Sequence, residues 1–342
     1  MWDRFLRACC FQSVDRTPVW FMRQAGRYMS EYRAIRARRT LIEICKAPEL
    51  ATQVTLQPVQ ALGVDAAILF ADILLPLEPM RASFEFRADD GPLIHSPIGD
   101  RAGVDALRIP DPEADLGYVL ETVRLVRREL EGKTPLVGFA GAPFTMASYL
   151  IEGGKSTSFL RTKRFMHREP AIWASLLEKL VEVVRRYLRA QIGAGAQAVQ
   201  IFDSWAGALT VYDYAEFVAP YMKVLFDDLK TTGVPVIHFS ADNGHLLELQ
   251  RDTGGSVIGV GWQTPIDVAA TRLGKSVAIQ GNLDPVALLA PRPILARRVE
   301  QILEAVARPT GYVFNLGHGI LPETDPAAVA FVVDRVHSWR TE

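Results

Sequence analysis

The chain has 342 residues, of which 49% are hydrophobic and 23% charged, and its net charge at pH 7 is −1. This composition is typical of a globular protein with a large core, and the near-neutral charge argues against general nucleic-acid binding, which needs a basic excess. No apolar run approaches the ~20 residues of a membrane span, the N-terminus lacks a secretory apolar region, and the three cysteines offer no disulfide framework. We therefore expect a cytoplasmic protein without membrane or nucleic-acid partners.

Eight short apolar runs follow one another along the chain, and helical patterns separate them. Apolar runs bounded by glycine and polar residues are typical of strands buried on both faces of a parallel sheet. The expected strands are Pro18–Met22, Ala66–Phe70, Leu136–Ala140, Ala198–Phe202, Val234–Phe239, Ser256–Val260, Val277–Gln280 and Tyr312–Leu316. Eight such units predict a single α/β domain over residues 1–342, a (β/α)8 TIM barrel, with a doubly wound sheet as the alternative.

The helices between these runs have recognisable faces and ends. Apolar residues at helical spacing predict helices around 177–188 and 295–306. Asp325 and Pro326 are typical of the N-cap and first position of a final helix.

Two segments interrupt the regular alternation. Arg81–Pro97 alternates in hydrophobicity and contains Asp89-Asp90-Gly91, which predicts a β-hairpin excursion after the second strand. The polar stretch Lys155–His167 predicts a lid-like loop over the same end of the barrel.

Polar and glycine residues gather where the expected strands end. Active sites of (β/α)8 barrels lie at the carboxyl ends of the strands, so this is where a ligand is expected. Glycines let the backbone approach a ligand, and isolated polar side chains supply specific contacts. The strand ends carry Arg23 to Arg27, Asp72, Gly141 to Pro143, Asp203 to Gly207, His238 to Asn243, Gly261 to Thr264, Gly281 to Asp284 and Gly317 to Gly319.

Arginines are concentrated directly after the first expected strand. Between Arg23 and Arg39 there are six arginines and one acid, Glu31. A solvated helix face accounts for Arg33, Arg36, Arg38 and Arg39. It accounts poorly for Arg23 and Arg27, because a guanidinium leaving water at the mouth of an apolar strand needs an anion. We expect Gly26 to let the loop turn so that both face the cleft, with a ligand, or Asp72 in the empty site, as counter-ion.

Several motifs resemble cofactor sites without fitting them. Gly153-Gly154-Lys155-Ser156 resembles the tail of a phosphate loop, but Tyr149 stands where that motif needs glycine. Gly193 and Gly195 precede a strand, which is the wrong order for a dinucleotide fingerprint. His238 and His245 do not suffice for a metal, and no cysteine follows Cys45 to supply a thiolate zinc ligand.

Residues 18–33 (PVWFMRQAGRYMSEYR) and 138–154 (GFAGAPFTMASYLIEGG) resemble the two signature regions of the uroporphyrinogen decarboxylase family. Similar segments occur in the same order at 69–74 (LFADIL), 201–207 (IFDSWAG), 281–285 (GNLDP) and 314–320 (FNLGHGI). The resemblance runs from about residue 15 to the C-terminus. It implies a homodimeric (β/α)8 barrel that uses no metal or cofactor. The implied reaction converts the four acetate side chains of uroporphyrinogen III to methyl groups, giving coproporphyrinogen III.

The resemblance also implies roles for individual residues. Arg23 and Arg27 correspond to arginines that contact substrate carboxylates, and Asp72 to an aspartate that hydrogen-bonds the pyrrole N–H groups. The implied catalytic residues are Asp72, Arg23, Tyr149 and His318, and the implied substrate-binding residues are Arg23, Gln24, Ala25, Gly26, Arg27, Asp72, Tyr149, Ser204 and His318. Which arginine meets the reacting acetate stays open. The proton donor also stays open among Tyr149, His318 and an arginine-bound water or acid.

Two other functions stay open beside decarboxylation. Zinc-dependent methyltransferases on a related barrel use a His-x-Cys pair and a later cysteine, where this chain has His238-Phe239-Ser240 and His318. A barrel that binds a tetrapyrrole without acting on it is the third possibility. Purely structural roles also compete: Asp72 as a helix cap, Ser204 as a turn residue, Tyr149 as a buried tyrosine. Trp20, Phe21 and Phe139 are expected in the barrel core.

Overall fold

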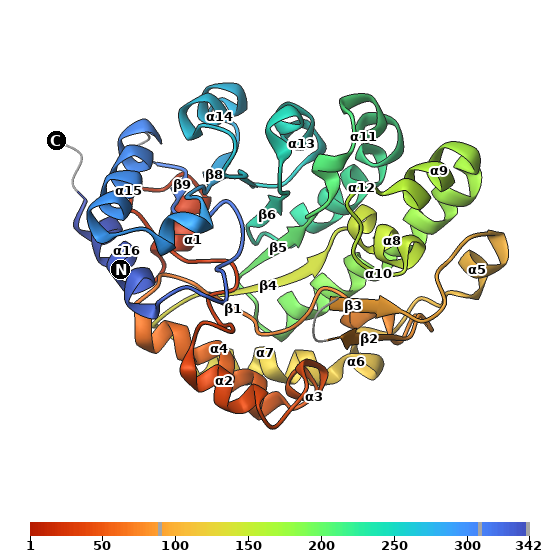
Figure 1. Ribbon diagram of the computed structural model, residues 1–342, viewed down its shortest axis with the longest axis horizontal. Helices are drawn as coiled ribbons and strands as arrows, with labels where there is room; N and C mark the ends of the chain where they lie inside the picture. Colours follow the sequence, from red (N-terminus) through yellow and green to blue (C-terminus); the bar gives the residue numbers. More distant parts are fainter. Residues whose placement is uncertain (88–90, 307–309, 340–342) are drawn as a thin grey trace.

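The computed structural model describes residues 1–87, 91–306 and 310–339. Its main sheet contains seven parallel strands that curl round a common axis (Figure 1). In sheet order these are β1 (Ala67–Ile68), β4 (Leu136–Gly141), β5 (Ala198–Phe202), β6 (Val236–Phe239), β7 (Val257–Gly259), β8 (Ala278–Gln280) and β9 (Tyr312–Val313).

The extended segment at residues 18–20 fills the eighth position of the barrel. Val19 forms a parallel bridge with Phe314 beside β9, and its carbonyl accepts a hydrogen bond from Asp65 N, 2.8 Å away, just before β1. The expected strand Pro18–Met22 is therefore present in its place, shortened to a single bridge because the chain turns sharply after Met22. The (β/α)8 barrel is confirmed, and the doubly wound alternative is wrong.

Each strand position is followed by a helix that covers the outside of the barrel (Figure 1). These helices are α4 (Pro48–Leu62), α7 (Gly117–Glu129), α10 (Pro170–Ala194), α12 (Ala219–Lys230), α13 (Leu247–Thr253), α14 (Ile266–Leu273), α15 (Arg292–Val306) and α16 (Pro326–Ser338). The predicted cap of the last helix is confirmed, because the Asp325 side chain accepts a hydrogen bond from Ala327 N and Pro326 is the first helical residue.

The other elements lie mostly in the connections between the strands and these helices. They are α1 (Arg4–Cys9), α2 (Ser30–Arg36), α3 (Leu41–Cys45), α5 (Arg101–Ala106), α6 (Pro112–Asp115), α8 (Pro143–Glu152), α9 (Leu160–Arg168), α11 (Val211–Phe217) and the 3-10 turns η1 (Leu75–Leu77), η2 (Ala206–Ala208), η3 (Asn243–His245) and η4 (Pro285–Leu289). The predicted hairpin is confirmed as the antiparallel pair β2 (Phe84–Arg87) and β3 (Gly91–Ile94). Asp89 and Asp90 of its predicted turn lie outside the described residues.

The lid-like loop expected over Lys155–His167 is wrong for most of its length, because Leu160 onward forms helix α9. Thr162, Phe165 and Met166 are buried on one face of this helix, while its charged residues lie on the other. The Glu152 carboxylate holds its first turn by accepting hydrogen bonds from Thr162 N (2.8 Å) and Thr162 Oγ1 (2.9 Å).

The amino-terminal half of the barrel interior is filled by side chains. Trp20 and Phe21 are fully buried, as expected, and Phe5 from α1 packs edge-on against Trp20. A buried chain of hydrogen bonds crosses the interior from Trp20 Nε1 to Gln280 and from Gln280 to Gln200, each 3.0 Å long. The main cavity lies beyond this packing, toward the carboxyl ends of the strands.

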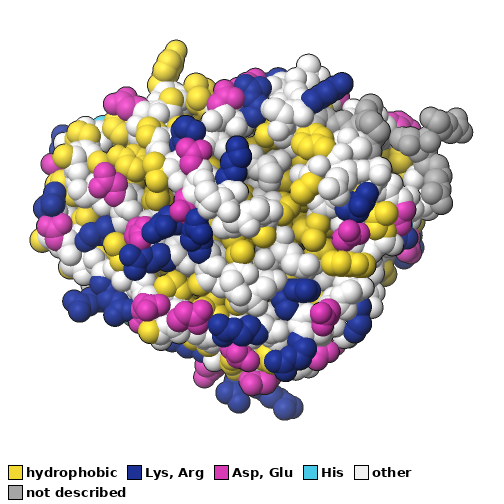
Figure 2. All heavy atoms as spheres, turned by 180° about the vertical axis from the view of Figure 1, so that it is seen from behind, with side chains coloured by type: hydrophobic (Ala, Val, Ile, Leu, Met, Phe, Trp, Pro, Cys, Tyr) yellow, Lys and Arg dark blue, Asp and Glu magenta, His cyan; other side chains and the backbone are white. Residues whose placement is uncertain are grey.

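On the face seen in Figure 2, lysine and arginine are interspersed with aspartate and glutamate, as the near-zero net charge leads one to expect. Among the described residues, no helix is both long and apolar enough to cross a membrane.

Candidate active site

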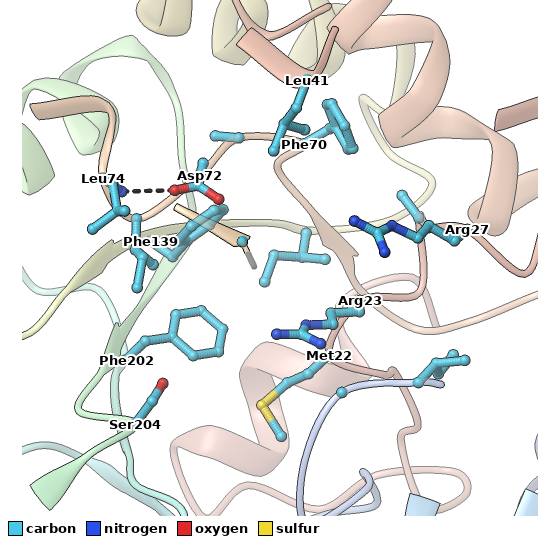
Figure 3. Close-up of a pocket in the computed structure, with 18 of the residues that line it drawn as sticks. Met22, Arg23, Arg27, Leu41, Phe70, Asp72, Leu74, Phe139, Phe202 and Ser204 are labelled. Atoms are coloured by element: carbon cyan, nitrogen blue, oxygen red, sulfur yellow. Dashed lines mark hydrogen bonds between the residues drawn. The ribbon is translucent and has the colours of Figure 1, made fainter. Parts of the chain in front are cut away.

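A cavity of about 490 Å³ opens at the carboxyl ends of the strands. One part of its wall is apolar: Phe139, Phe202 and Phe239 from β4, β5 and β6 contribute aromatic rings, and Ile68, Phe70 and Leu74 continue this surface. Figure 3 shows the guanidinium groups of Arg23 and Arg27 directed into this space, with Asp72 and Ser204 on the side across from them. The cavity therefore combines an apolar wall with a few converging polar groups, as ligand sites commonly do.

The loop that carries both arginines turns at Arg23 itself. Arg23 has φ 61°, a left-handed conformation that costs a non-glycine residue about 1 kcal/mol or more. The flanking backbone is tied down, since Met22 N donates to Asn315 Oδ1 (3.2 Å) and Ile320 N donates to the Met22 carbonyl (2.9 Å). Gly26 was expected to make this turn through its flexibility. Its role is instead one of space, because a Cβ there would lie 3.0 Å from the Arg23 carbonyl oxygen.

Neither arginine has a carboxylate partner among the described residues. The Arg23 charge acts on Asp72 only through space, so the expectation that Asp72 would pair with the arginines in the empty site is wrong. Two further cations, Arg36 and Lys155, line the same cavity, while Asp72 is its only carboxylate among the described lining residues. The empty cavity therefore has a surplus of positive charge, which favours a ligand with several negative charges.

Asp72 combines a structural contact with exposure to the cavity. Its Oδ1 accepts a hydrogen bond from Leu74 N at 2.9 Å, so the capping role considered from the sequence is real. Its other oxygen accepts no hydrogen bond from the described part of the chain and is free to meet a ligand. Burial raises the pKa of Asp72 to about 6, although the Leu74 N–H and the Arg23 charge act in the opposite direction. At neutral pH the group is an anion in a poorly solvated site.

Tyr149 lines the cavity from α8 and is held by stacking. Its ring lies over that of Trp205, with centroids 4.0 Å apart and planes inclined by 33°. Burial, together with the Asp72 charge, raises the pKa of its hydroxyl above the ordinary value. The hydroxyl therefore stays protonated and can act as a hydrogen-bond donor in the cavity.

His318 lines the cavity from the loop after β9. Its Nδ1 accepts a hydrogen bond from Gly319 N at 2.8 Å, which assigns the proton of the neutral ring to Nε2. Burial and the nearby Arg23 charge lower its pKa to about 4. His318 is consequently a neutral N–H donor at pH 7, not a charged acid.

The remaining residues predicted for the site divide into two groups. Ala25, Gly26 and Ser204 line the cavity as expected. Gln24 does not: it is fully buried, its Oε1 accepts from Phe21 N, and its Nε2 donates to the Ala66 carbonyl, both at 3.0 Å. Gln24 therefore joins the first strand position to the segment before β1, and its side chain does not line the cavity.

Sequence reasoning also missed residues that the fold brings to the cavity. Arg36 was assigned to a solvated helix face, but it is half-buried at the end of α2 and lines the cavity, unlike the exposed Arg33, Arg38 and Arg39. Phe139 was assigned to the core; it is buried, yet its ring forms part of the cavity wall. The position of Arg36 on the same face of α2 as Tyr32, four residues earlier, was the available signal.

The His238-Phe239-Ser240 segment divides between two environments. Phe239 faces the cavity, whereas His238 is fully buried against Phe226 of α12, with ring centroids 4.8 Å apart. The Ser240 hydroxyl is also buried and accepts a hydrogen bond from Gln250. The histidine of this segment therefore does not face the cavity, which disfavours the zinc methyltransferase alternative.

The family model described as uroporphyrinogen decarboxylase (URO-D) matches residues 2–339. A protein of Sorangium cellulosum named uroporphyrinogen decarboxylase is 61% identical over 338 residues, covering 99% of this chain and 97% of the relative. One of the same name from Carboxydothermus hydrogenoformans is 52% identical, covering 98% and 96% of the two chains. A methyltransferase structure from Methanosarcina mazei superposes with a TM-score of 0.82 at 18% identity over 97% of each chain, a likeness of fold. The chain belongs to the uroporphyrinogen decarboxylase family.

Proposed function

We propose that this protein removes CO2 from the four acetate side chains of uroporphyrinogen III and releases coproporphyrinogen III. The observation that carries the proposal is one anionic group, Asp72, in a cavity that has an apolar aromatic wall and whose other charged lining residues among those described are cations, namely Arg23, Arg27, Arg36 and Lys155. A cyclic tetrapyrrole with eight carboxylates matches this combination, because its ring system is apolar and its periphery is strongly anionic.

The substrate itself can supply the electron sink that decarboxylation needs. Protonation of a pyrrole carbon next to the acetate-bearing position gives a cationic, iminium-like ring. The electron pair of the breaking C–CO2 bond then flows into this ring and leaves an exocyclic methylene. A second proton converts the methylene to a methyl group, and loss of the first proton restores the pyrrole. The net change is one carboxylate and one proton consumed, with one CO2 released.

In this scheme Asp72 stabilises the cationic ring. Its free oxygen accepts hydrogen bonds from pyrrole N–H groups, which become more acidic as the ring gains positive charge. The interaction therefore strengthens in the transition state, as differential binding requires. The apolar wall formed by Phe139 and Phe202 limits access of water and strengthens the electrostatic attraction.

The two arginines are assigned different tasks. The Arg23 charge acts on Asp72, Tyr149 and His318, whereas the Arg27 charge acts on Tyr32 at the side of the cavity. We assign Arg23 to the reacting acetate and Arg27 to carboxylates that do not react. If both arginines bound the reacting carboxylate tightly, they would stabilise the ground state and slow the reaction. Assigning Arg27 to carboxylates that do not react avoids this effect.

The protons are assigned to solvent, delivered through water ordered by Arg23. The raised pKa of Tyr149 makes its hydroxyl a hydrogen-bond donor that orients this water and keeps its own proton. His318 with a pKa of about 4 is a poor acid at neutral pH because it carries no extra proton to give. It serves instead as a neutral donor through Nε2, and the Ser204 hydroxyl supplies a further contact on the opposite side.

Assembly as a homodimer and a cytoplasmic location belong to the same proposal. Exposed apolar side chains, Trp262, Val286 and Ile294, surround a second hollow beyond the barrel mouth and offer a surface for a second copy. Sedimentation equilibrium at micromolar concentration tests this directly, and a monomer would contradict it.

The activity is tested by incubating the purified, metal-free protein with freshly reduced uroporphyrinogen III and separating the products by chromatography. We expect species with seven, six, five and four carboxylates, ending in coproporphyrinogen III. Tight binding without any loss of carboxylates would instead support the non-catalytic tetrapyrrole-binding barrel.

A further inference from the structure

The β2–β3 hairpin packs closely against the turn formed by Gly153, Gly154, Lys155 and Ser156. Gly153 ends α8 with φ 88°, and a Cβ on it would lie 2.8 Å from Pro97 Cγ. A Cβ on Gly154 would lie 3.0 Å from the Pro92 carbonyl oxygen. The Ile94 N–H of β3 donates to the Gly153 carbonyl at 2.8 Å. The two glycines therefore allow the hairpin to pack closely on this turn. Close packing thus explains why the sequence resembles a phosphate loop although no nucleotide site is formed here.

Lys155 extends from this turn along the hairpin to the cavity. Its aliphatic end lies against Gly91 of β3, where a Cβ would be 2.7 Å from Lys155 Cε and 3.2 Å from Nζ. Lys155 lines the cavity together with Phe86 and Pro92 of the hairpin. Within the described residues its ammonium group has no hydrogen-bond or ion-pair partner. The absence of a side chain at position 91 thus leaves room for a cation that the described residues do not neutralise.

The place of Lys155 differs from that of the two arginines. Arg23 and Arg27 come from the loop after the first strand position, whereas Lys155 comes from the connection between α8 and α9 and is exposed at the cavity rim. The Arg23 charge influences Asp72, Tyr149 and His318, and the Lys155 charge influences none of them. Lys155 is therefore separated from the groups assigned to the chemistry.

We propose that Lys155 is a specificity-determining residue that binds a peripheral carboxylate of the tetrapyrrole at the hairpin side of the cavity. The proposal rests on the function proposed above and adds a subsite to it. Because this carboxylate lies away from the reacting acetate, Lys155 binds ground state and transition state equally, so it acts on KM and leaves kcat unchanged. An exposed ammonium group makes this contact sensitive to salt.

The test compares Lys155→Met, which keeps the length of the side chain and removes its charge, with Lys155→Arg, which keeps the charge. Lys275→Met is the matched control, because Lys275 is exposed and lies just before β8, at the opposite end of the barrel. We expect Lys155→Met to raise KM about three- to tenfold at low ionic strength with kcat within about twofold. The difference should shrink at about 0.5 M salt, where the screening length is only a few ångströms. Lys155→Arg and Lys275→Met should resemble the wild type.

Equilibrium binding of uroporphyrinogen, followed by quenching of tryptophan fluorescence, separates this inference from the proposed function because it needs no turnover. If the wild-type protein binds uroporphyrinogen but does not decarboxylate it, the proposed function is wrong. The ratio of the Kd of Lys155→Met to that of the wild type still tests the subsite in that case. An unchanged KM and Kd in Lys155→Met overturns the inference, and so does a loss of kcat at unchanged KM. Thermal unfolding should be the same for all three variants, since Lys155 is exposed.

Discussion

The Arg23 side chain lies directly on Gly319, so closely that a Cβ on Gly319 would be 2.7 Å from Arg23 Cγ and 3.0 Å from Nε. Arg23 is already held in a left-handed backbone conformation by bonds on either side. The left-handed backbone of Arg23 and the absence of a side chain on Gly319 together direct the Arg23 guanidinium into the cavity. Arg23 is thus positioned by residues about 300 positions away in the sequence, on the loop that also carries His318.

Gly319→Ala should displace Arg23 while leaving the fold intact. The added methyl group meets the middle of the arginine side chain, which cannot move aside without turning its guanidinium. We expect kcat/KM to fall about 10- to 100-fold, the size of effect that a misplacement of about 1 Å produces. Steady-state kinetics with uroporphyrinogen measures this.

Gly193→Ala is the matched control, since nothing lies within 4 Å of a Cβ at that helical position. It should retain full activity and gain up to about 1 kcal/mol of stability from helix propensity. Equal activity of the Gly319→Ala and Gly193→Ala variants would show that the Arg23–Gly319 contact does not matter.

The two arginines should give different kinetic signatures. Arg23→Gln removes charge beside Asp72 and Tyr149, so we expect kcat to fall about 100-fold. Arg27→Gln removes a contact to a non-reacting carboxylate, so we expect KM to rise about 10-fold with little change in kcat. The reverse pattern, or identical effects of both substitutions, would refute the assignment.

The ionised carboxylate of Asp72 should lower the free energy of unfolding at neutral pH. Its pKa rises from 3.8 in the unfolded chain to about 6 in the folded protein, so between these values the folded state binds more protons. Stability therefore falls as pH increases from about 4 to about 6, by on the order of 2 kcal/mol. Asp72→Asn avoids this loss and can still cap Leu74 N.

Urea unfolding at pH 7.5 and pH 4 checks this prediction. The Asp72→Asn variant should be the more stable protein at pH 7.5, and the gain should largely disappear at pH 4. A gain that is equal at both pH values would mean that ionisation of Asp72 is not its source. In the wild type, kcat should rise with pH through about 6 as the carboxylate forms.

Gln24 should affect stability and not catalysis. Gln24→Met keeps the shape of the side chain but leaves Phe21 N–H and the Ala66 carbonyl without their partner, at a cost of about 1–3 kcal/mol. We expect a lower urea midpoint, with kcat and KM of the folded enzyme unchanged. A raised KM at full folding would restore Gln24 to the substrate-binding residues.

Much of this architecture is readable from the sequence, because buried parallel strands are continuous apolar runs. Six of the eight runs contain the observed strands, and β4 extends one residue beyond a seventh. Asp72, Tyr149 and His318 follow from segment resemblance as lining residues of one cavity. The first run was overestimated, since apolar character beyond Val19 serves packing and the turn at Arg23 rather than pairing.

The errors concern residues whose role depends on three-dimensional neighbours. Nothing local distinguishes Gln24, which bridges two strand positions, from its neighbours Ala25 and Gly26, which line the cavity. Lys155 resembles an ordinary surface cation in sequence, and only the fold of the chain beside the hairpin brings it to the cavity. For Arg36 the one sequence signal is its spacing of four residues from Tyr32 on α2. The left-handed backbone of Arg23 has no sequence signal, because such a conformation would be assigned to a nearby glycine such as Gly26.

The most direct test of the account is a single-turnover measurement with Asp72→Asn in excess over uroporphyrinogen, beside the wild type. The substitution preserves size and the Leu74 contact and removes only the charge that stabilises the cationic ring. We predict binding within about threefold of wild type and a first decarboxylation slowed at least about 100-fold. A first decarboxylation at near-normal rate would contradict the central role given to the Asp72 carboxylate.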